Sequence, residues 1–125
     1  LLFDLGHILY KEEYIEKSKK LLMGISVAVR KSPTYHSNWA LLQGKIELGV
    51  YEVAIVGKDA TKVANEMQKQ YLPNCLYVGG TEENLPLLKG RLTDGTTIYV
   101  CMDKVCNLPT TEVGSAVKQV LETKR

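Results

Sequence analysis

Tyr51-Glu-Val-Ala-Ile-Val-Gly57 is the stretch that decides the fold, because the sequence changes character there. Its nearly continuous apolar run is typical of a strand that is covered on both faces of a sheet, and Gly57 ends it. Asp59 can then cap a helix, whose predicted core face is Ala60, Val63, Ala64, Met67 and Tyr71. Pro73 ends that helix, and a second strand over residues 75–78 runs into Gly79-Gly80. A strand-helix-strand unit of this kind is expected to pair its two strands in parallel.

The residues that follow predict two more strands and a last helix. A short helix is expected around Leu85, Leu87 and Leu88, and Thr93-Asp-Gly95 predicts a turn. The third strand is predicted over residues 96–101, and the fourth, over about 104–108, returns antiparallel. The last helix starts near Thr111, and its predicted core face is Val113, Ala116, Val117, Val120 and Leu121. Residues 50–125 therefore predict a small three-layer α/β unit with a mixed, mainly parallel sheet.

Residues 1–49 predict helices instead. Apolar residues recur with helical spacing at Leu1, Leu2, Leu5, Ile8 and Leu9, and a second helical face is formed by Tyr14, Ser18, Leu21, Leu22, Ile25 and Val29. Pro33 stops the second helix, because proline lacks the amide donor and restricts the residue before it. A third helix is predicted from about Ser37 to Leu48, burying Trp39, Leu42 and Ile46, with Gly49 as its C-terminal cap. The helical start without an initiator Met suggests a C-terminal piece of a longer protein.

Composition excludes several classes of function. The chain has 125 residues, 45% of them hydrophobic, and its 16 basic and 14 acidic residues give a net charge of +2. The charges are interspersed, without the basic stripe and interleaved aromatics that favour nucleic acid, and no apolar run is long enough to span a bilayer. Three cysteines are too few, and odd in number, for a secreted disulfide scaffold. A reducing, cytoplasmic location is expected.

Cys101 and Cys106 form the one constellation that could carry sulfur chemistry. If Asp103-Lys104 is a two-residue loop, the two cysteines lie opposite each other on adjacent strands, within reach of a disulfide. The pair is interpreted either as two packed thiols or as a reversible disulfide. A thioredoxin-type site would need closer Cys-x-x-Cys spacing at a helix N-terminus. Zinc would need further ligands from the scattered Cys75, His7 and His36, so no metal is expected.

The strand ends offer a second candidate site. Gly57-Lys58-Asp59 and Gly79-Gly80 are expected at the carboxyl edge of the parallel strands, where open α/β sheets bind ligands and anions. The alternative reading is a tight turn followed by a helix cap. The sequence contains neither the dinucleotide fingerprint nor the phosphate-binding loop. These absences argue against a nucleotide kinase or a dinucleotide-dependent dehydrogenase, and no cofactor is expected.

Asp4, His7 and Trp39 are weaker candidates in the helical segment. His7 follows Asp4 by three residues, so the two could form an acid-base pair, and Trp39 could stack on a sugar ring. A lone histidine on an apolar helix is more often a packed residue, and a tryptophan near a helix start is more often an anchor than a sugar-stacking platform. The sequence therefore predicts no catalytic set in this chain.

Several short motifs resemble one protein family over nearly the whole chain. They are Tyr71-Leu-Pro-Asn74, Ile55-Val-Gly57, Leu2-Phe-Asp-Leu5, Tyr14-x-x-Lys17 and, most specifically, Tyr99-Val-Cys101-x-x-x-x-Cys106. With these motifs the chain resembles the C-terminal region of the thioredoxin-domain family of spermatogenesis-associated protein 20 and its bacterial relatives, whose biochemical role is unsettled. The resemblance implies a thioredoxin-like domain, then a toroid of helical hairpins like that of glycosidases and N-acylglucosamine 2-epimerases, and a small closing α/β region.

The resemblance suggests a function and two alternatives. Residues 1–49 would be the last helices of the toroid, and residues 50–125 a non-catalytic accessory region that packs against the rest of the parent chain. The family's thioredoxin-type cysteine motif has no counterpart here, so its redox activity does not carry over. The alternatives are part of a sugar-directed hydrolase or isomerase, which rests on likeness of fold, and a regulatory thiol pair. Self-association through exposed helix faces is a further expectation.

Overall fold

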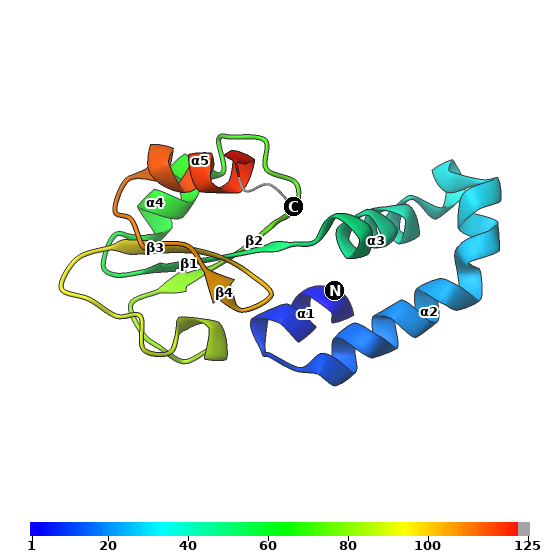
Figure 1. Cartoon of the computed structure of the whole chain (residues 1–125), viewed down its shortest axis with the longest axis horizontal. Coiled ribbons are helices and arrows are strands. Elements are labelled where there is room, and N and C mark those ends of the chain that lie inside the picture. The colour runs from blue at the N-terminus through cyan, green and yellow to red at the C-terminus, as the bar shows by residue number, and fades with distance from the viewer. Residues whose placement is uncertain (123–125) are drawn as a thin grey trace. The chain divides into compact units, whose positions relative to one another are not determined.

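The computed structural model of the chain describes residues 1–122. The chain divides into two compact units, Leu1–Val50 and Tyr51–Arg125, and each has its own architecture (Figure 1). The first unit contains helices only, and the second contains the sheet. Among the described residues, no helix is both long and apolar enough to cross a membrane.

The helical unit contains α1 (Leu2–Ile8), α2 (Glu12–Lys31), the 3-10 turn η1 (Pro33–His36) and α3 (Ser37–Leu48). The α2 helix ends before Pro33, which opens the 3-10 turn, as the restriction that proline places on its neighbours predicts. Gly49 follows α3 as its C-terminal cap, with a positive φ of 75° that favours glycine. An ion pair of 2.7 Å between Lys45 Nζ and Asp4 Oδ1 joins α3 to α1.

Burial in the helical unit is less complete than the sequence predicts. Its buried side chains lie in α1 and α2, among them Phe3, Leu22 and Val29, and at Val50 after α3. The α3 helix has no buried residue, so the burial expected of Trp39, Leu42 and Ile46 is only partial. Leu21, predicted on the core face of α2, is exposed. These differences arise because a helix needs neighbours along its whole apolar stripe before that stripe is covered.

The second unit is built on a four-stranded sheet with the order β2-β1-β3-β4. Its strands are β1 (Tyr51–Val56), β2 (Cys75–Gly80), β3 (Thr97–Met102) and β4 (Val105–Cys106). The β1–β2 pair is parallel, as predicted, whereas β3 pairs antiparallel with both β1 and β4. The sheet is therefore mixed, as predicted, but it is not mainly parallel, because β3 runs antiparallel to both of its neighbours.

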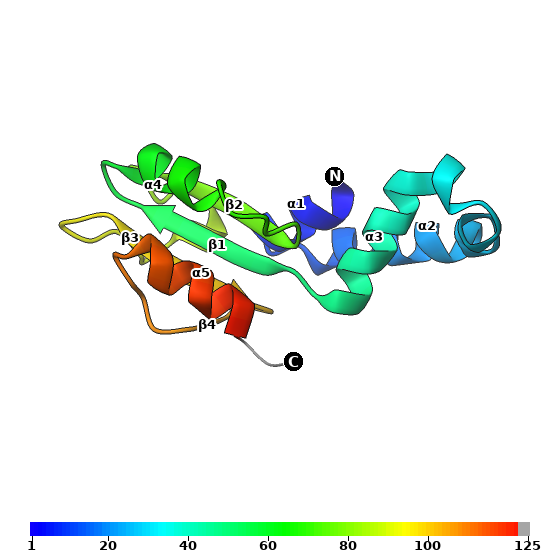
Figure 2. The same ribbon diagram turned by 90° about the horizontal axis from the view of Figure 1, so that it is seen from above.

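Two helices, α4 (Ala60–Met67) and α5 (Val113–Glu122), cover one face of the sheet (Figure 1). Seen from above, they lie side by side along the strands (Figure 2), with α4 against β2 and α5 against β3. The core between helices and sheet contains Tyr51, Val53, Ile55, Ala60, Met67, Ile98, Val100, Ala116 and Val120. Every residue of β1 is buried, which bears out the prediction of a strand covered on both faces.

The opposite face of the sheet is covered by the connection between β2 and β3. This connection contains the 3-10 turn η2 (Pro86–Leu88), whose Leu87 and Leu88 are buried. Thr93 Oγ1 lies 2.8 Å from Thr97 Oγ1 of β3. The side chains of alternate residues point to the same face of a strand, so Thr97, Tyr99 and Cys101 all face this connection. We refer to residues 81–96 as the covering loop.

Three details of the predicted helices were wrong. Asp59 precedes α4, but its side chain makes no capping hydrogen bond. Tyr71 is 89% exposed and Leu121 is 69% exposed, so neither belongs to the core. The α4 helix ends at Met67, well before Pro73, and turns replace the last helical turn that would have carried Tyr71 inward.

Candidate functional site

The cysteine pair lies in the β3–β4 hairpin, at one edge of the sheet. Asp103 and Lys104 form a two-residue loop in which both residues have positive φ, 50° and 68°. Tight hairpins of this type need left-handed backbone at both central positions. The loop places Met102 opposite Val105 and Cys101 opposite Cys106. The two cysteines form a disulfide, with Cα atoms 3.8 Å apart.

The two sulfur-bearing residues differ in their access to solvent. Cys101 lies inside β3 and is only 1% exposed. Cys106 ends the short β4 strand and is exposed. A reagent in solution can therefore reach the disulfide from the Cys106 side only, since the sheet and the covering loop enclose Cys101.

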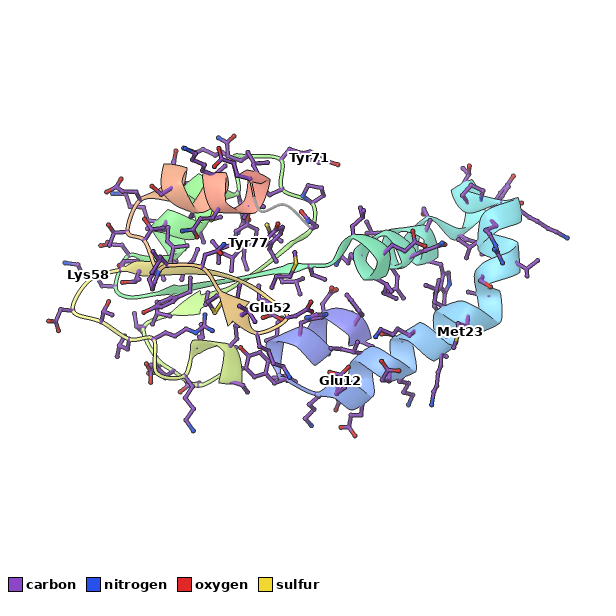
Figure 3. The ribbon with its side chains drawn as sticks, viewed as in Figure 1. Glu12, Met23, Glu52, Lys58, Tyr71 and Tyr77 are labelled. Atoms are coloured by element: carbon purple, nitrogen blue, oxygen red, sulfur yellow. A yellow bond between two sulfur atoms is a disulfide. The ribbon has the colours of Figure 1, made fainter. Side chains whose placement is uncertain are left out.

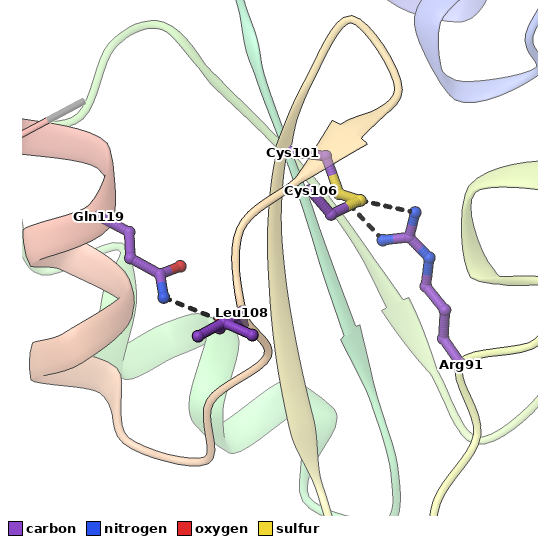
Figure 4. The surroundings of a disulfide bond; sticks show 5 residues. All are labelled: Arg91, Cys101, Cys106, Leu108 and Gln119. Carbon is purple, nitrogen blue, oxygen red and sulfur yellow. Dashed lines mark hydrogen bonds between the residues drawn. A yellow bond between two sulfur atoms is a disulfide. The ribbon is translucent and has the colours of Figure 1, made fainter. Parts of the chain in front are cut away.

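Arg91 of the covering loop binds both sulfur atoms (Figure 4). Its Nη1 donates to Cys101 Sγ at 3.1 Å and its Nη2 donates to Cys106 Sγ at 3.2 Å. The guanidinium also lies over the ring of Tyr99, with Cζ 5.0 Å from the ring centroid. The hydroxyl of Tyr99 donates to the carbonyl oxygen of Arg91 at 3.1 Å. The arginine is thus held by both its backbone and its side chain.

Glu83 fixes the stretch of the covering loop that carries Arg91. Its Oε1 accepts a hydrogen bond from the backbone N–H of Leu92 at 2.6 Å. Backbone donors of Leu92, Gly90 and Arg91 lower the pKa of this carboxyl, because they bind its charged form. Asn84 Nδ2 donates in turn to Glu82 Oε2 at 2.6 Å. The loop therefore has an internal scaffold that sets the position of the guanidinium.

The chain that leaves the hairpin is tied down on its other side. Gln119 Nε2 of α5 donates to the carbonyl oxygen of Leu108 at 2.9 Å (Figure 4). Backbone hydrogen bonds in both directions join Ile98 of β3 to Thr110. The covering loop and α5 thus hold the hairpin region from both sides, which limits how far the disulfide can move relative to Arg91.

The glycines and polar residues of the strand ends lie together at the edge where β1 and β2 finish. Val56 is paired with Gly80, and Lys58 lies just beyond the end of β1 (Figure 3). Backbone donors here already have partners, because the N–H of Gly57 donates to the Gly80 carbonyl at 3.0 Å and that of Asp59 to Thr96 Oγ1 at 3.0 Å. These contacts fit a tight turn. Anion binding at this edge stays a prediction.

The third cysteine lies apart from the pair. Cys75 is a free, half-buried thiol at the start of β2, and burial raises its pKa to about 11. It is therefore protonated and unreactive near neutral pH. No group of three or more histidine, cysteine or acidic side chains in the described part of the chain is placed to hold a metal ion.

The candidates in the helical unit are brought together in part. Asp4 and Trp39 both line a cavity of about 370 Å³. The lining is mostly aliphatic and aromatic, and the carboxylate of Asp4 forms an ion pair with Lys45. His7 is buried, with its ring 4.7 Å from that of Phe3 in an edge-on contact. A hydrophobic neighbour of this kind is typical of a packed histidine.

Sequence reasoning missed Arg91 and Glu83, which hold the site together. Arg91 is 10 and 15 residues from the cysteines that it contacts, so no short-range motif links them. The covering loop has irregular structure apart from η2, and hydrophobic periodicity says nothing about where its side chains lie. A single arginine between two turns carries no signal that could have identified it.

Comparison with known proteins gives no relative: no family model, no curated protein and no solved structure matches this chain.

Proposed function

We propose that this chain is a non-catalytic accessory region of a larger thioredoxin-domain protein. In this proposal the helical unit packs against further helices of the parent, as the last part of a toroid, and the α/β unit closes the chain. The observation that carries the proposal is the open apolar surface of the helical unit. The family resemblance of the Tyr99-Val-Cys101-x-x-x-x-Cys106 segment is what suggests a thioredoxin-domain parent.

The apolar surface extends over two helices. Its large exposed side chains are Leu21, Met23 and Val27 on α2, and Leu41 and Leu48 on α3. Each of these residues is more than half exposed, and α3 buries none of its side chains. Large apolar side chains that are exposed to water are the kind of surface that interaction sites use. Additional helices from the same chain are the occupants that the resemblance suggests.

Charge substitution in the full-length gene product tests this proposal. Val27→Asp should leave the present chain folded, because the side chain is 59% exposed here. In the longer protein the same change should cost about 2–4 kcal/mol of unfolding free energy, since it buries an unpaired charge. Asn65→Asp, which adds the same charge at an exposed position of α4 in the other unit, is the matched control.

The outcome separates the alternatives clearly. If Val27→Asp costs no more than Asn65→Asp in the longer protein, the face stays in water and the proposal fails. A gene product that lacks both thioredoxin-like and toroid segments would also refute it. Deletion of residues 50–125 should make the parent insoluble or unfolded, and a truncated parent with full activity would contradict the accessory role.

A second candidate function is a regulatory thiol pair, and the contacts of Arg91 with both sulfurs favour it. A cation beside a cysteine pair stabilises the thiolate form and so favours reversible reduction. Titration of free thiols in the native protein, before and after mild oxidation, should show two thiols lost only when Cys101 and Cys106 are both present. Retention of all three thiols would reject this function. The sugar-directed alternative has no comparable support and stays a prediction.

A further inference from the structure

We propose that the Cys101–Cys106 disulfide is an exchange site for dithiol reductants, in which Cys106 Sγ is the attacked sulfur and Cys101 is the leaving thiolate that Arg91 stabilises. The inference rests on the second proposed function, the regulatory thiol pair, and assigns each sulfur a role. It follows from three observations on the described residues: the unequal exposure of the cysteines, the two sulfur contacts of Arg91, and the scaffold that fixes Arg91.

Unequal exposure decides which sulfur is attacked. An incoming thiolate must reach one sulfur and expel the other, and Cys106 is the exposed residue of the pair. Cys101 is 1% exposed and lies within β3, so its sulfur is poorly placed to receive a nucleophile. The exposed cysteine therefore accepts the new bond, and the buried one leaves.

Arg91 stabilises the leaving thiolate of Cys101, which burial would otherwise disfavour. A thiolate in a buried position is disfavoured by desolvation, which raises the pKa of the thiol and slows its departure. The guanidinium Nη1 already donates to Cys101 Sγ at 3.1 Å in the disulfide form. A fixed positive charge at this distance favours the thiolate as its negative charge develops. Glu83 and Tyr99 already hold the arginine in place, so the covering loop does not lose further conformational entropy when the thiolate forms.

The exchange balances in two steps. A thiolate of the reductant attacks Cys106 Sγ; a new sulfur–sulfur bond forms, the Cys101–Cys106 bond breaks, and its electron pair leaves with Cys101. The second thiolate of the reductant then attacks the reductant's own sulfur in this mixed disulfide and expels Cys106 as a thiolate. The protein disulfide is reduced to two thiols, the dithiol is oxidised to its cyclic disulfide, and the two protons of the reductant pass to the cysteines or to solvent.

The opposite role for Arg91 is to protect the disulfide from reduction. A guanidinium stacked on Tyr99 could cover the sulfurs and slow their reduction. The two roles predict opposite effects of removing the arginine, so kinetics on the folded chain decide between them. Dithiothreitol serves as the probe reductant, and Lys62→Gln on α4 is the control, since it makes the same change of net charge on the other face of the sheet.

Arg91→Gln should slow reduction by dithiothreitol by about three- to tenfold, because the leaving thiol becomes more basic. Arg91→Lys, which keeps the charge but loses the fork of donors, should lie between this variant and the native protein. Lys62→Gln should reduce at the native rate. In the reduced proteins, a pH titration followed by the NMR shift of the Cys101 Cβ, which needs no reagent to reach the sulfur, should place the Cys101 thiol pKa about one unit higher in Arg91→Gln.

Trapping identifies the attacked sulfur. Brief reaction with glutathione, an acid quench and peptide mass spectrometry should locate the mixed disulfide on Cys106. Glutathione on Cys101, faster reduction of Arg91→Gln, or equal rates in native protein and both Arg91 variants would each overturn the inference. If Arg91→Gln does not fold, Arg91→Lys and the trapping result still decide. A native protein that resists reduction until it is unfolded would refute the thiol-pair function itself.

Discussion

Gly57 shows how strongly one residue can depend on its backbone conformation. Its φ of 137° belongs to a region that side chains rarely adopt, and a Cβ there would lie 2.6 Å from the Cα of Thr96 and against the carbonyl oxygen of Gly95. We therefore expect Gly57→Ala to lower the free energy of unfolding of the α/β unit by about 2–4 kcal/mol. Gly95→Ala is the control, because a Cβ at Gly95 meets nothing within 4 Å. Equal urea midpoints for the two variants would contradict the close approach of the turn to the covering loop.

Glu83 gives a prediction about acid stability. Backbone donors lower the pKa of its carboxyl below the ordinary 4.5, so the folded state favours the carboxylate. The resulting stabilisation is present above pH 4.5 and is lost as the pH falls through the lowered pKa. Glu83→Gln should therefore lower stability at pH 7 and flatten its decline between pH 5 and the acid limit, both measured by urea unfolding. Glu82→Gln, one residue away, should keep the native pH profile.

At the scale of the element, α2 is a helix with one easily improved position. Gly24 lies in its interior, is exposed, and would meet no atom within 4 Å if it carried a Cβ. Gly24→Ala should raise the free energy of unfolding of the helical unit by about 0.5–1 kcal/mol, because alanine loses less backbone entropy in a helix. Gly6→Ala should do the reverse, since its Cβ would lie 2.5 Å from Cγ1 of Ile15. Thermal unfolding followed by circular dichroism measures both changes.

The elements also show which parts of the structure the sequence can predict. The β1 strand runs from Tyr51 to Val56 as predicted, because an unbroken apolar run bounded by a glycine has few alternatives. Tyr71 and Leu121 were wrongly predicted to be buried, because the helical spacing of apolar residues continues past the last residue that packs against the sheet. Where a helix stops being buried depends on the surface that it packs against, which the spacing does not show. The opposed cysteines followed from the two-residue loop. Arg91 did not, since its position depends on an irregular loop that folds back over the sheet.

At the scale of the whole molecule, the two units should respond differently to reductant. The disulfide closes a ring of six residues in the α/β unit, and such a bond is worth about 2 kcal/mol in the chain-entropy account. For a unit of this size, its loss should lower the melting temperature by roughly 10 °C. We expect dithiothreitol to shift the transition of residues 51–125 and to leave that of residues 1–50 in place.

Calorimetry or fluorescence scans with and without reductant would measure this shift, and Cys101→Ser/Cys106→Ser should reproduce the reduced curve and be insensitive to reductant. A single transition that moves as a whole would show that the two units unfold together. Burial raises the pKa of the Cys75 thiol to about 11. In a parallel alkylation experiment at pH 8, this thiol should therefore stay unmodified at temperatures below the transition of the α/β unit.

The two-residue length of β4 has a consequence for solubility. An outer strand that short, tied by its last residue to β3, leaves little unpaired backbone for another chain to extend the sheet on that side. Breaking the bond would free β4 to fray and would open the edge of β3 at Cys101 and Met102 to strand addition by a second molecule. The disulfide thus reduces aggregation through one edge of the sheet. During prolonged storage in reductant, we expect β-rich assemblies to form slowly.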